Sequence, residues 1–80
     1  MSFDVYSDVI LTRDMSEREL RAGDVGTVVE RHAAPGASEE GYSVEFFDMT
    51  GNTVAVVMLP ANALRLPAAA DRPAVRALGA

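Results

Sequence analysis

The residues best suited to nucleophilic catalysis are one histidine and four serines. His32 is the only histidine of the 80-residue chain, and the four serines considered are Ser7, Ser16, Ser38 and Ser43. A catalytic triad needs a nucleophile, a base and an orienting acid within hydrogen-bond reach of one another. The serines fall in different segments, and no sequence signature surrounds any of them. We therefore interpret His32 as an ordinary surface histidine at the end of a strand.

Carboxylates are the second group that could do chemistry. Two-carboxylate catalysis requires both acids in one cleft with their pKa values pushed apart. Residues 39–40 are adjacent in a loop, and Glu45 and Asp48 lie on an outward face, so a solvated surface explains them. Asp14 and Asp24 could meet near a turn and bind a cation weakly, but their spacing matches no calcium loop.

Missing residue types exclude further classes of site. The chain has no cysteine, and all seven of its cations are arginines. Disulfides, zinc–cysteine sites and thiol nucleophiles are thereby excluded, and there is no lysine for a phosphate-binding G-x-x-x-x-G-K loop. We predict that the protein is not an enzyme and uses no metal or cofactor.

The charge is acidic and unevenly distributed. The net charge is −5, and residues 1–60 hold eleven of the twelve acids but only four of the seven arginines. Such a body repels nucleic acid, which binds to basic patches, and favours a basic protein partner. The acidic N-terminus does not resemble a signal peptide, and no segment has the length of a membrane span. We expect a cytoplasmic protein.

The elements that would position these residues are short strands. Residues 5–12 are rich in β-branched and aromatic types, which predicts a strand. Ser16 and Glu19 have the spacing of a capping box, which predicts a single helical turn ending at Leu20. Met15 and Leu20 would pin that turn to the core.

A turn within residues 20–30, LRAGDVGTVVE, leads into the next strand. Gly23 is free to take positive φ, Asp24 can bond neighbouring amides, and Gly26 can let two backbones approach closely. Residues 27–31 are predicted to form the strand itself.

The second half of the chain predicts a hairpin. Residues 32–41 form a loop of small residues, the most mobile part of the domain. Residues 42–47 alternate as a strand does, with three residues facing inward, namely Tyr42, Val44 and Phe46. Residues 48–52 connect this strand to the next, with Gly51 or Asn52 in the left-handed position.

The returning strand covers residues 53–59 and is stopped by Pro60, and a short turn leads to residues 64–66. Four to five short strands at even spacing indicate a mainly β fold, a small antiparallel barrel rather than an open sheet, because closure removes exposed edges. We assign residues 1–66 to this barrel and residues 67–80 to a tail. The tail is either a short helix from Pro73 to Leu78 or disordered.

Five stretches together resemble a family of very short bacterial proteins known as a domain of unknown function. They are DVILTRD (8–14), LRAGDVGTVVE (20–30), YSVEF (42–46), GNTVAVVML (51–59) and LRL (64–66). The resemblance covers about residues 4–66. It implies an SH3-like β-barrel of about five strands with one short helical turn, and it implies no activity. The segment GDVGTVV is also similar to the turn of KOW-type barrels in ribosomal and transcription proteins, and to SH3-like accessory domains of enzyme subunits.

The strand over residues 53–59 is apolar on both sides. If Thr53, Ala55, Val57 and Leu59 face the interior, alternation points three others outward, namely Val54, Val56 and Met58. Phe47 and Ile10 are in a similar position. An exposed apolar wall of this kind is typical of a contact site.

Three coverings of this wall are open. The tail could fold back with Leu66, Val75 and Leu78 against it, a second copy could pair across it, or a different protein could dock there. We therefore predict a small non-catalytic protein-interaction module, an antitoxin-like or immunity-like partner of a basic protein, or a homo-oligomer.

The alternative is a KOW-like barrel that associates with nucleic acid or the ribosome. Its cations would be four arginines near the turn, namely Arg13, Arg18, Arg21 and Arg31, and Tyr42 or Phe47 would offer a stacking face. The acidic charge and the lack of lysine disfavour this alternative.

Overall fold

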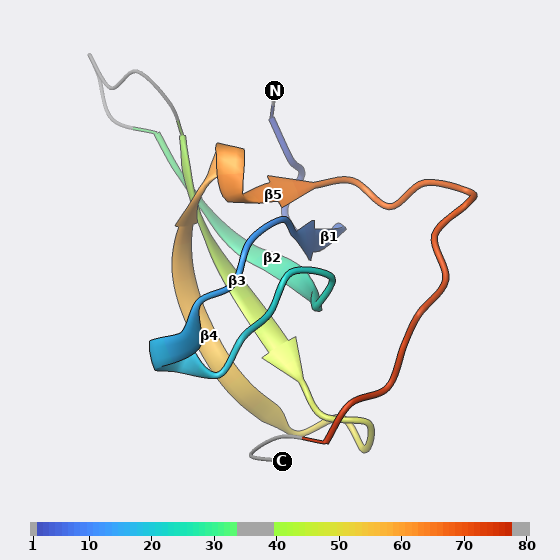
Figure 1. The fold of residues 1–80 in the computed structure, drawn as a ribbon. Coiled ribbons are helices and arrows are strands. Elements are labelled where there is room, and N and C mark those ends of the chain that lie inside the picture. Colours follow the sequence, from blue (N-terminus) through green and yellow to red (C-terminus); the bar gives the residue numbers. More distant parts are fainter. Residues whose placement is uncertain (1, 34–39, 78–80) are drawn as a thin grey trace.

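The computed structural model describes residues 2–33 and 40–77, which form one curled antiparallel sheet (Figure 1). Its strand order is β4-β3-β2-β1-β5. The elements are β1 (Asp8–Leu11), η1 (Ser16–Arg18), β2 (Val25–His32), β3 (Gly41–Phe47), β4 (Thr53–Pro60), η2 (Ala61–Ala63) and β5 (Leu64–Arg65). The five strands curl into a half-barrel, and η1 and η2 are short 3-10 turns. The predicted mainly β fold of about five antiparallel strands is confirmed.

The inner face of the curled sheet carries the hydrophobic core. All five strands contribute to it, and its buried members are Phe3, Val9, Leu11, Leu20, Val28, Tyr42, Val44, Phe46, Val57, Leu59, Ala63 and Leu64. The predicted inward alternation of β3 is confirmed. The Tyr42 hydroxyl accepts a hydrogen bond from the Phe3 backbone N–H at 3.1 Å, and the two rings meet edge to face with centroids 5.2 Å apart. These contacts fasten the N-terminal segment to the core.

The first strand is shorter than predicted, because a tight turn precedes it. Tyr6 has a φ of 71°, and the Ser7 N–H donates to the Asp4 carbonyl at 3.1 Å. Two hydrogen bonds still hold this segment beside β2, since Tyr6 N–H donates to the Val28 carbonyl at 2.6 Å and Val28 N–H donates to the Ser7 carbonyl at 3.0 Å. The strand itself begins only at Asp8.

The capping box predicted at Ser16 and Glu19 is wrong. Met15 occupies the cap position of η1 without any side-chain hydrogen bond, and Glu19 takes a left-handed φ of 56°. The backbone closes the turn instead, because Met15 and Leu20 exchange N–H···O=C bonds of 2.8 and 3.1 Å. Leu20 is buried in the core and Met15 packs against it, so the predicted pinning of the turn is confirmed.

Asp48 organises the connection between β3 and β4. Its carboxylate accepts the backbone N–H groups of Asn52 and Thr50, each at 2.9 Å, and the Thr50 hydroxyl at 2.8 Å. These hydrogen bonds lower the pKa of Asp48, and the bond from the Asn52 backbone N–H has the largest effect. Gly51 has a φ of 90°, so it is Gly51 that takes the left-handed position.

The tail crosses the outside of the molecule as an extended chain. It has a turn at residues 69–70. No helix forms over residues 73–77, so of the two alternatives for the tail the helix from Pro73 to Leu78 is wrong for these residues; Leu78 lies outside the described residues. Most of the loop predicted over residues 32–41 also falls outside them, because residues 34–39 are not described.

Candidate functional site

The outer side of β4 is an exposed apolar surface. Alternate residues of this strand reach the core, so Val54, Val56 and Met58 project from the opposite side. Their exposed fractions are 44%, 51% and 64%, as predicted. Thr53, predicted to face the interior, is exposed instead, because the register shifts beside it and pairs Thr53 with Phe47. Phe47, at the end of β3, is 44% exposed. We call four of these residues the β4 face, namely Phe47, Val54, Val56 and Met58.

Polar side chains of β3 border the β4 face. In the strand register, Glu45 lies opposite Val56 and Ser43 lies opposite Met58. The Glu45 carboxylate also accepts a hydrogen bond from the hydroxyl of Thr53, the first residue of β4. Polar side chains of β3 therefore lie along one side of the β4 face, and Glu45 makes this border acidic.

The β4 face lies in a part of the chain that has no cations. Neither lysine nor arginine occurs from His32 to Leu64, whereas Glu45 and Asp48 stand beside the face. Three arginines of the described residues are paired with carboxylates elsewhere, in the ion pairs Arg31–Glu40, Arg65–Asp71 and Arg76–Asp24. The face therefore has acidic neighbours and no lysine or arginine from its own part of the chain.

Ile10 is not part of this exposed surface, contrary to the prediction. It is only 6% exposed, so a partner cannot reach it in this structure. The residues on either side of Ile10 in β1, Val9 and Leu11, point into the core, so Ile10 lies on the outer side of the strand. There it is placed between Val25 of β2 and Arg65 of β5. Val25 is 49% exposed. The sequence did not indicate that Val25 belongs to a strand, because the predicted strand began at Thr27, whereas β2 begins at Val25.

His32 and Ser43 meet across β2 and β3, a contact that the sequence did not indicate. The His32 Nε2 lies 2.8 Å from the Ser43 Oγ, and a carboxylate oxygen of Glu30 lies 3.8 Å from the same nitrogen. In a catalytic triad the acid instead binds Nδ1, which leaves Nε2 to the serine. The arrangement therefore differs from a triad, and it stands beside the β4 face because Ser43 pairs with Met58.

The three residues predicted to shape the turn before β2 have the predicted roles. Gly23 has a φ of 97°, and the Asp24 carboxylate accepts the Arg21 backbone N–H at 2.9 Å. A Cβ atom added at Gly26 would lie 2.5 Å from Cγ1 of Val44. Gly26 therefore permits the close approach of β2 and β3 that its place in the sequence predicted.

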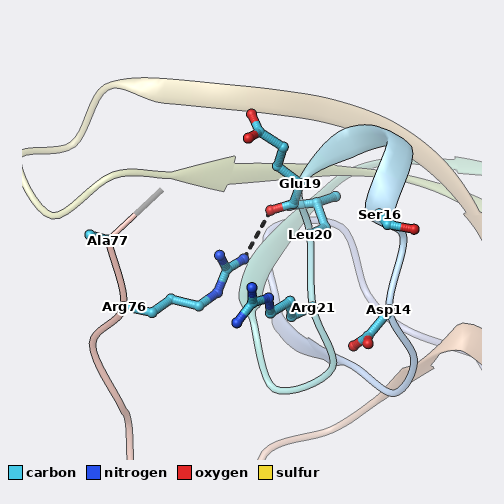
Figure 2. A pocket seen from close by; sticks show the side chains of 7 residues that line it. All are labelled: Asp14, Ser16, Glu19, Leu20, Arg21, Arg76 and Ala77. Atoms are coloured by element: carbon cyan, nitrogen blue, oxygen red, sulfur yellow. Dashed lines mark hydrogen bonds between the residues drawn. The ribbon is translucent and has the colours of Figure 1, made fainter. Parts of the chain in front are cut away.

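The tail lies against this turn, where it lines one side of an open cavity of about 460 Å³ (Figure 2). The Arg76 guanidinium is 2.5 Å from the Asp24 carboxylate and donates to the Glu19 carbonyl at 3.0 Å. The cavity is lined by Asp14, Ser16, Glu19, Leu20, Arg21, Arg76 and Ala77. Asp24 is thus engaged by Arg76, and Asp14 accepts the backbone N–H of Ala22 at 2.9 Å, so the two acids are not left to share a cation.

The tail does not cover the β4 face through the residues predicted to do so. Leu66 is 48% exposed and Val75 is 79% exposed, while the β4 face itself stays open. The third residue of that prediction, Leu78, lies outside the described residues. Covering by the tail through Leu66 and Val75 is therefore wrong, and the two predictions that involve another chain stay open.

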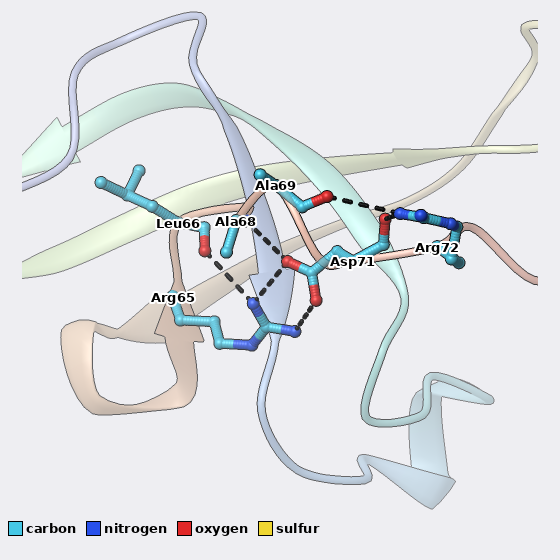
Figure 3. Close-up of polar contacts among 6 residues, drawn as sticks. All are labelled: Arg65, Leu66, Ala68, Ala69, Asp71 and Arg72. Atoms are coloured by element: carbon cyan, nitrogen blue, oxygen red, sulfur yellow. Dashed lines mark hydrogen bonds and ion pairs between the residues drawn. The ribbon is translucent and has the colours of Figure 1, made fainter.

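A bidentate ion pair fixes the start of the tail (Figure 3). The two terminal nitrogens of Arg65 each lie 2.8 Å from a carboxylate oxygen of Asp71, and the Ala68 N–H donates to the same carboxylate at 2.6 Å. These contacts, chiefly the one from Arg65, lower the pKa of Asp71 to about 2. Arg65 pairs with Ile10 in the register, so the clamp lies at the β1–β5 edge.

Residues 2–33 and 40–77 contain neither a metal-binding cluster nor a membrane-spanning helix. No three histidine or acidic side chains of these residues are grouped so that they could hold a metal ion. No helix among them is long and apolar enough to cross a membrane.

The comparisons with known proteins identify the family. The family model described as Domain of unknown function (DUF4926) matches residues 5–66, so the chain belongs to this family. The match ends where the tail begins and includes every strand of the sheet. No curated protein and no solved structure matches the chain.

Proposed function

We propose that this protein is a small non-catalytic interaction module that binds a basic protein through the β4 face. The observation that carries the proposal is the row of Val54, Val56 and Met58, 44–64% exposed, beside the carboxylates of Glu45 and Asp48. Contiguous exposed apolar side chains with a polar rim are typical of protein contact sites.

The two parts of the surface would have different tasks. Burying apolar surface stabilises a complex by roughly 25 cal/mol per Å² before the costs of association are subtracted. The acidic border would mainly raise the association rate with a cationic partner and disfavour acidic ones. A basic protein with an apolar contact patch matches both properties of the β4 face.

An antitoxin-like or immunity-like role fits this chemistry best. A protein that neutralises a basic toxin needs a binding surface and an opposite charge, and it needs no catalytic groups. The chain carries a net charge of −5, and its one histidine does not have triad geometry with Ser43 and Glu30. Both properties support a neutralising partner.

Nucleic-acid binding has less support in the structure. Tyr42, one of the two residues considered for stacking on a base, is 0% exposed. Arg31, one of the four arginines considered for phosphate contacts, is paired with Glu40. Both groups are therefore engaged within the protein.

The test compares two valine-to-glutamate variants that change the charge equally. Val56→Glu alters the β4 face, and Val75→Glu alters an exposed valine of the tail. Tagged proteins capture partners in the native host, and each partner is purified and titrated against all three proteins at several salt concentrations. We expect a basic partner whose affinity falls at least about tenfold with Val56→Glu, stays unchanged with Val75→Glu and decreases with added salt.

Two results would contradict the proposal. One is a wild-type protein that stays monomeric and captures nothing. The other is a partner that binds both variants as well as it binds the wild type, because the binding surface would then lie elsewhere.

A further inference from the structure

We infer that the basic partner binds by adding an extended segment as a new strand along the free edge of β4. The inference deepens the proposed function and rests on it. It specifies how the partner is held, namely by backbone hydrogen bonds to β4, with side-chain contacts to the β4 face.

The geometry of the edge carries the inference. β4 is the last strand in the order β4-β3-β2-β1-β5 and is paired on one side with β3, from Thr53 to Pro60. Among the described residues, no strand pairs with its other side. Along any edge strand, alternate N–H and C=O groups point away from the sheet and can pair with an added strand.

Most of β4 lacks the usual protection of such an edge. Exposed edges are generally shortened, bulged outward or marked by charged residues and proline, which prevents pairing. β4 has eight residues, TVAVVMLP, with no charged residue and with its only proline at the last position. Its pairing with β3 shifts once, at Val54, because Thr53 pairs with Phe47 and Ala55 pairs with Phe46, and the register is regular from Ala55 to Pro60. Its outer side chains, 44–64% exposed, would lie beside those of an added strand.

The charges around β4 select a basic segment rather than a second copy of this chain. Glu45 lies opposite Val56 in the register, and Asp48 lies in the turn that leads into β4. From His32 to Leu64 the chain contains no lysine or arginine. Two copies joined along β4 would each bring acidic side chains and no lysine or arginine from residues 32–64, whereas a segment with cations would be attracted.

The recognition mode also predicts the pattern of the partner segment. Strand addition takes its affinity from main-chain hydrogen bonds and its specificity from alternate side chains. Apolar residues at every second position would continue the row of Val54, Val56 and Met58. Lysine or arginine on the same side, at the end of the segment beside the β3–β4 turn, would approach Asp48.

The test uses a designed probe peptide, blocked at both ends, with the sequence Lys-Thr-Val-Thr-Val-Thr-Lys. Two further peptides carry backbone N-methyl groups, one on the two valines and the other on the three threonines. A fourth replaces both lysines by glutamate. Binding of each peptide to the full chain is measured by titration, and hydrogen exchange of the backbone amides of β4 is followed with and without the probe.

Strand addition predicts an unequal effect of the two methylation patterns, because only one set of amides faces β4. We expect one methylated peptide to lose at least about tenfold in affinity and the other to bind nearly as the parent does. The glutamate peptide should bind more weakly than the parent. Alternate amides of β4 should exchange more slowly in the complex.

Several outcomes would overturn the inference without touching the proposed function. They are equal binding of both methylated peptides, unchanged exchange along β4, no binding of the parent peptide, or a second copy of this chain occupying the edge. If the natural partner still loses affinity with Val56→Glu, the β4 face remains the binding surface and only strand addition fails. If Val56→Glu has no effect either, the proposed function fails as well.

Discussion

The two edges of the sheet differ in length and in covering. At one edge, β5 is a strand of two residues, and the Arg65–Asp71 clamp lies beside it. At the other edge, β4 has eight residues, and no strand among the described residues pairs with its free side. A short edge with an ion pair offers little to an incoming strand, whereas a long apolar edge offers a continuous row of backbone groups.

The outer side chains show the same contrast. Ile10, on the outer side of β1, is 6% exposed, whereas Val56, on the outer side of β4, is 51% exposed. Both are β-branched residues on strands of one sheet. This difference in exposure means that the outer apolar residue Ile10 contributes to the stability of the fold, whereas Val56 is accessible to another molecule.

The largest expected effect distinguishes the two sides of β4 itself. Leu59→Ala should lower the free energy of unfolding by about 2–5 kcal/mol, because Leu59 is 2% exposed and its loss leaves a cavity in the core. Met58→Ala, next to it on the exposed side, should change it by less than about 0.5 kcal/mol. Urea unfolding of the three proteins measures both values, and equal losses would show that Met58 is packed rather than open.

The next effect concerns β2, which joins the covered half of the sheet to the open half. Gly26→Ala should cost about 1–3 kcal/mol of stability, because the new Cβ would meet Val44 at 2.5 Å and the Glu45 carbonyl oxygen at 3.0 Å. Gly41→Ala is the matched control, since no atom lies closer than 3.9 Å to its added Cβ. Thermal unfolding compares the two, and a tolerated Gly26→Ala would refute the close approach of β2 and β3.

A smaller effect compares the outer residues near the two edges. Ile10→Val removes one methylene from a buried side chain and should cost about 0.5–1.5 kcal/mol. Val54→Ala removes two methyl groups from a side chain that is 44% exposed and should cost less than about 0.5 kcal/mol. In denaturant titrations, Ile10→Val should therefore destabilise the protein more than Val54→Ala, although it removes fewer atoms. The reverse order would show that the outer residues near the two edges do not differ in burial as described.

The smallest effect concerns the clamp at the β5 edge and depends on pH. Arg65 and the Ala68 amide lower the pKa of Asp71 from 3.8 to about 2 in the folded protein. The unfolded chain therefore binds a proton more readily, so the contribution of the clamp is present above pH 3.8 and disappears as the pH falls towards about 2.

Solvent screening keeps this contribution small, because the clamp lies at the surface. Asp71→Asn should lower the melting temperature slightly at pH 6, and the difference from the wild type should be much smaller at pH 2, where the carboxylate of the folded protein is being protonated. Calorimetry at both pH values measures the difference. A difference that persists undiminished at pH 2 would show that the carboxylate charge is not its cause.

Local patterns account for the features that the sequence predicted correctly. The alternation of Tyr42, Val44 and Phe46, the exposed row on β4, and the roles of Gly23 and Gly26 each follow from a few neighbouring residues. The capping-box prediction failed although its spacing was correct, because the exchange of backbone hydrogen bonds between Met15 and Leu20 closes that turn instead.

The features that were missed involve partners far apart in the chain. Arg76 and Asp24 are 52 residues apart, and nothing in the sequence near either residue announces their ion pair. His32 and Ser43 meet only because β2 and β3 pair in one register. The burial of Ile10 likewise depends on how strands from both ends of the family domain come together.

The sequence alone determined the strand character, the acidic charge and the apolar outer row of β4, because side-chain alternation and charge are properties of short segments. Only the tertiary structure decided which outer residues are covered, where the tail is anchored and which strand remains at the edge. These depend on strand order and on long-range pairing, which bring together residues that no local pattern connects.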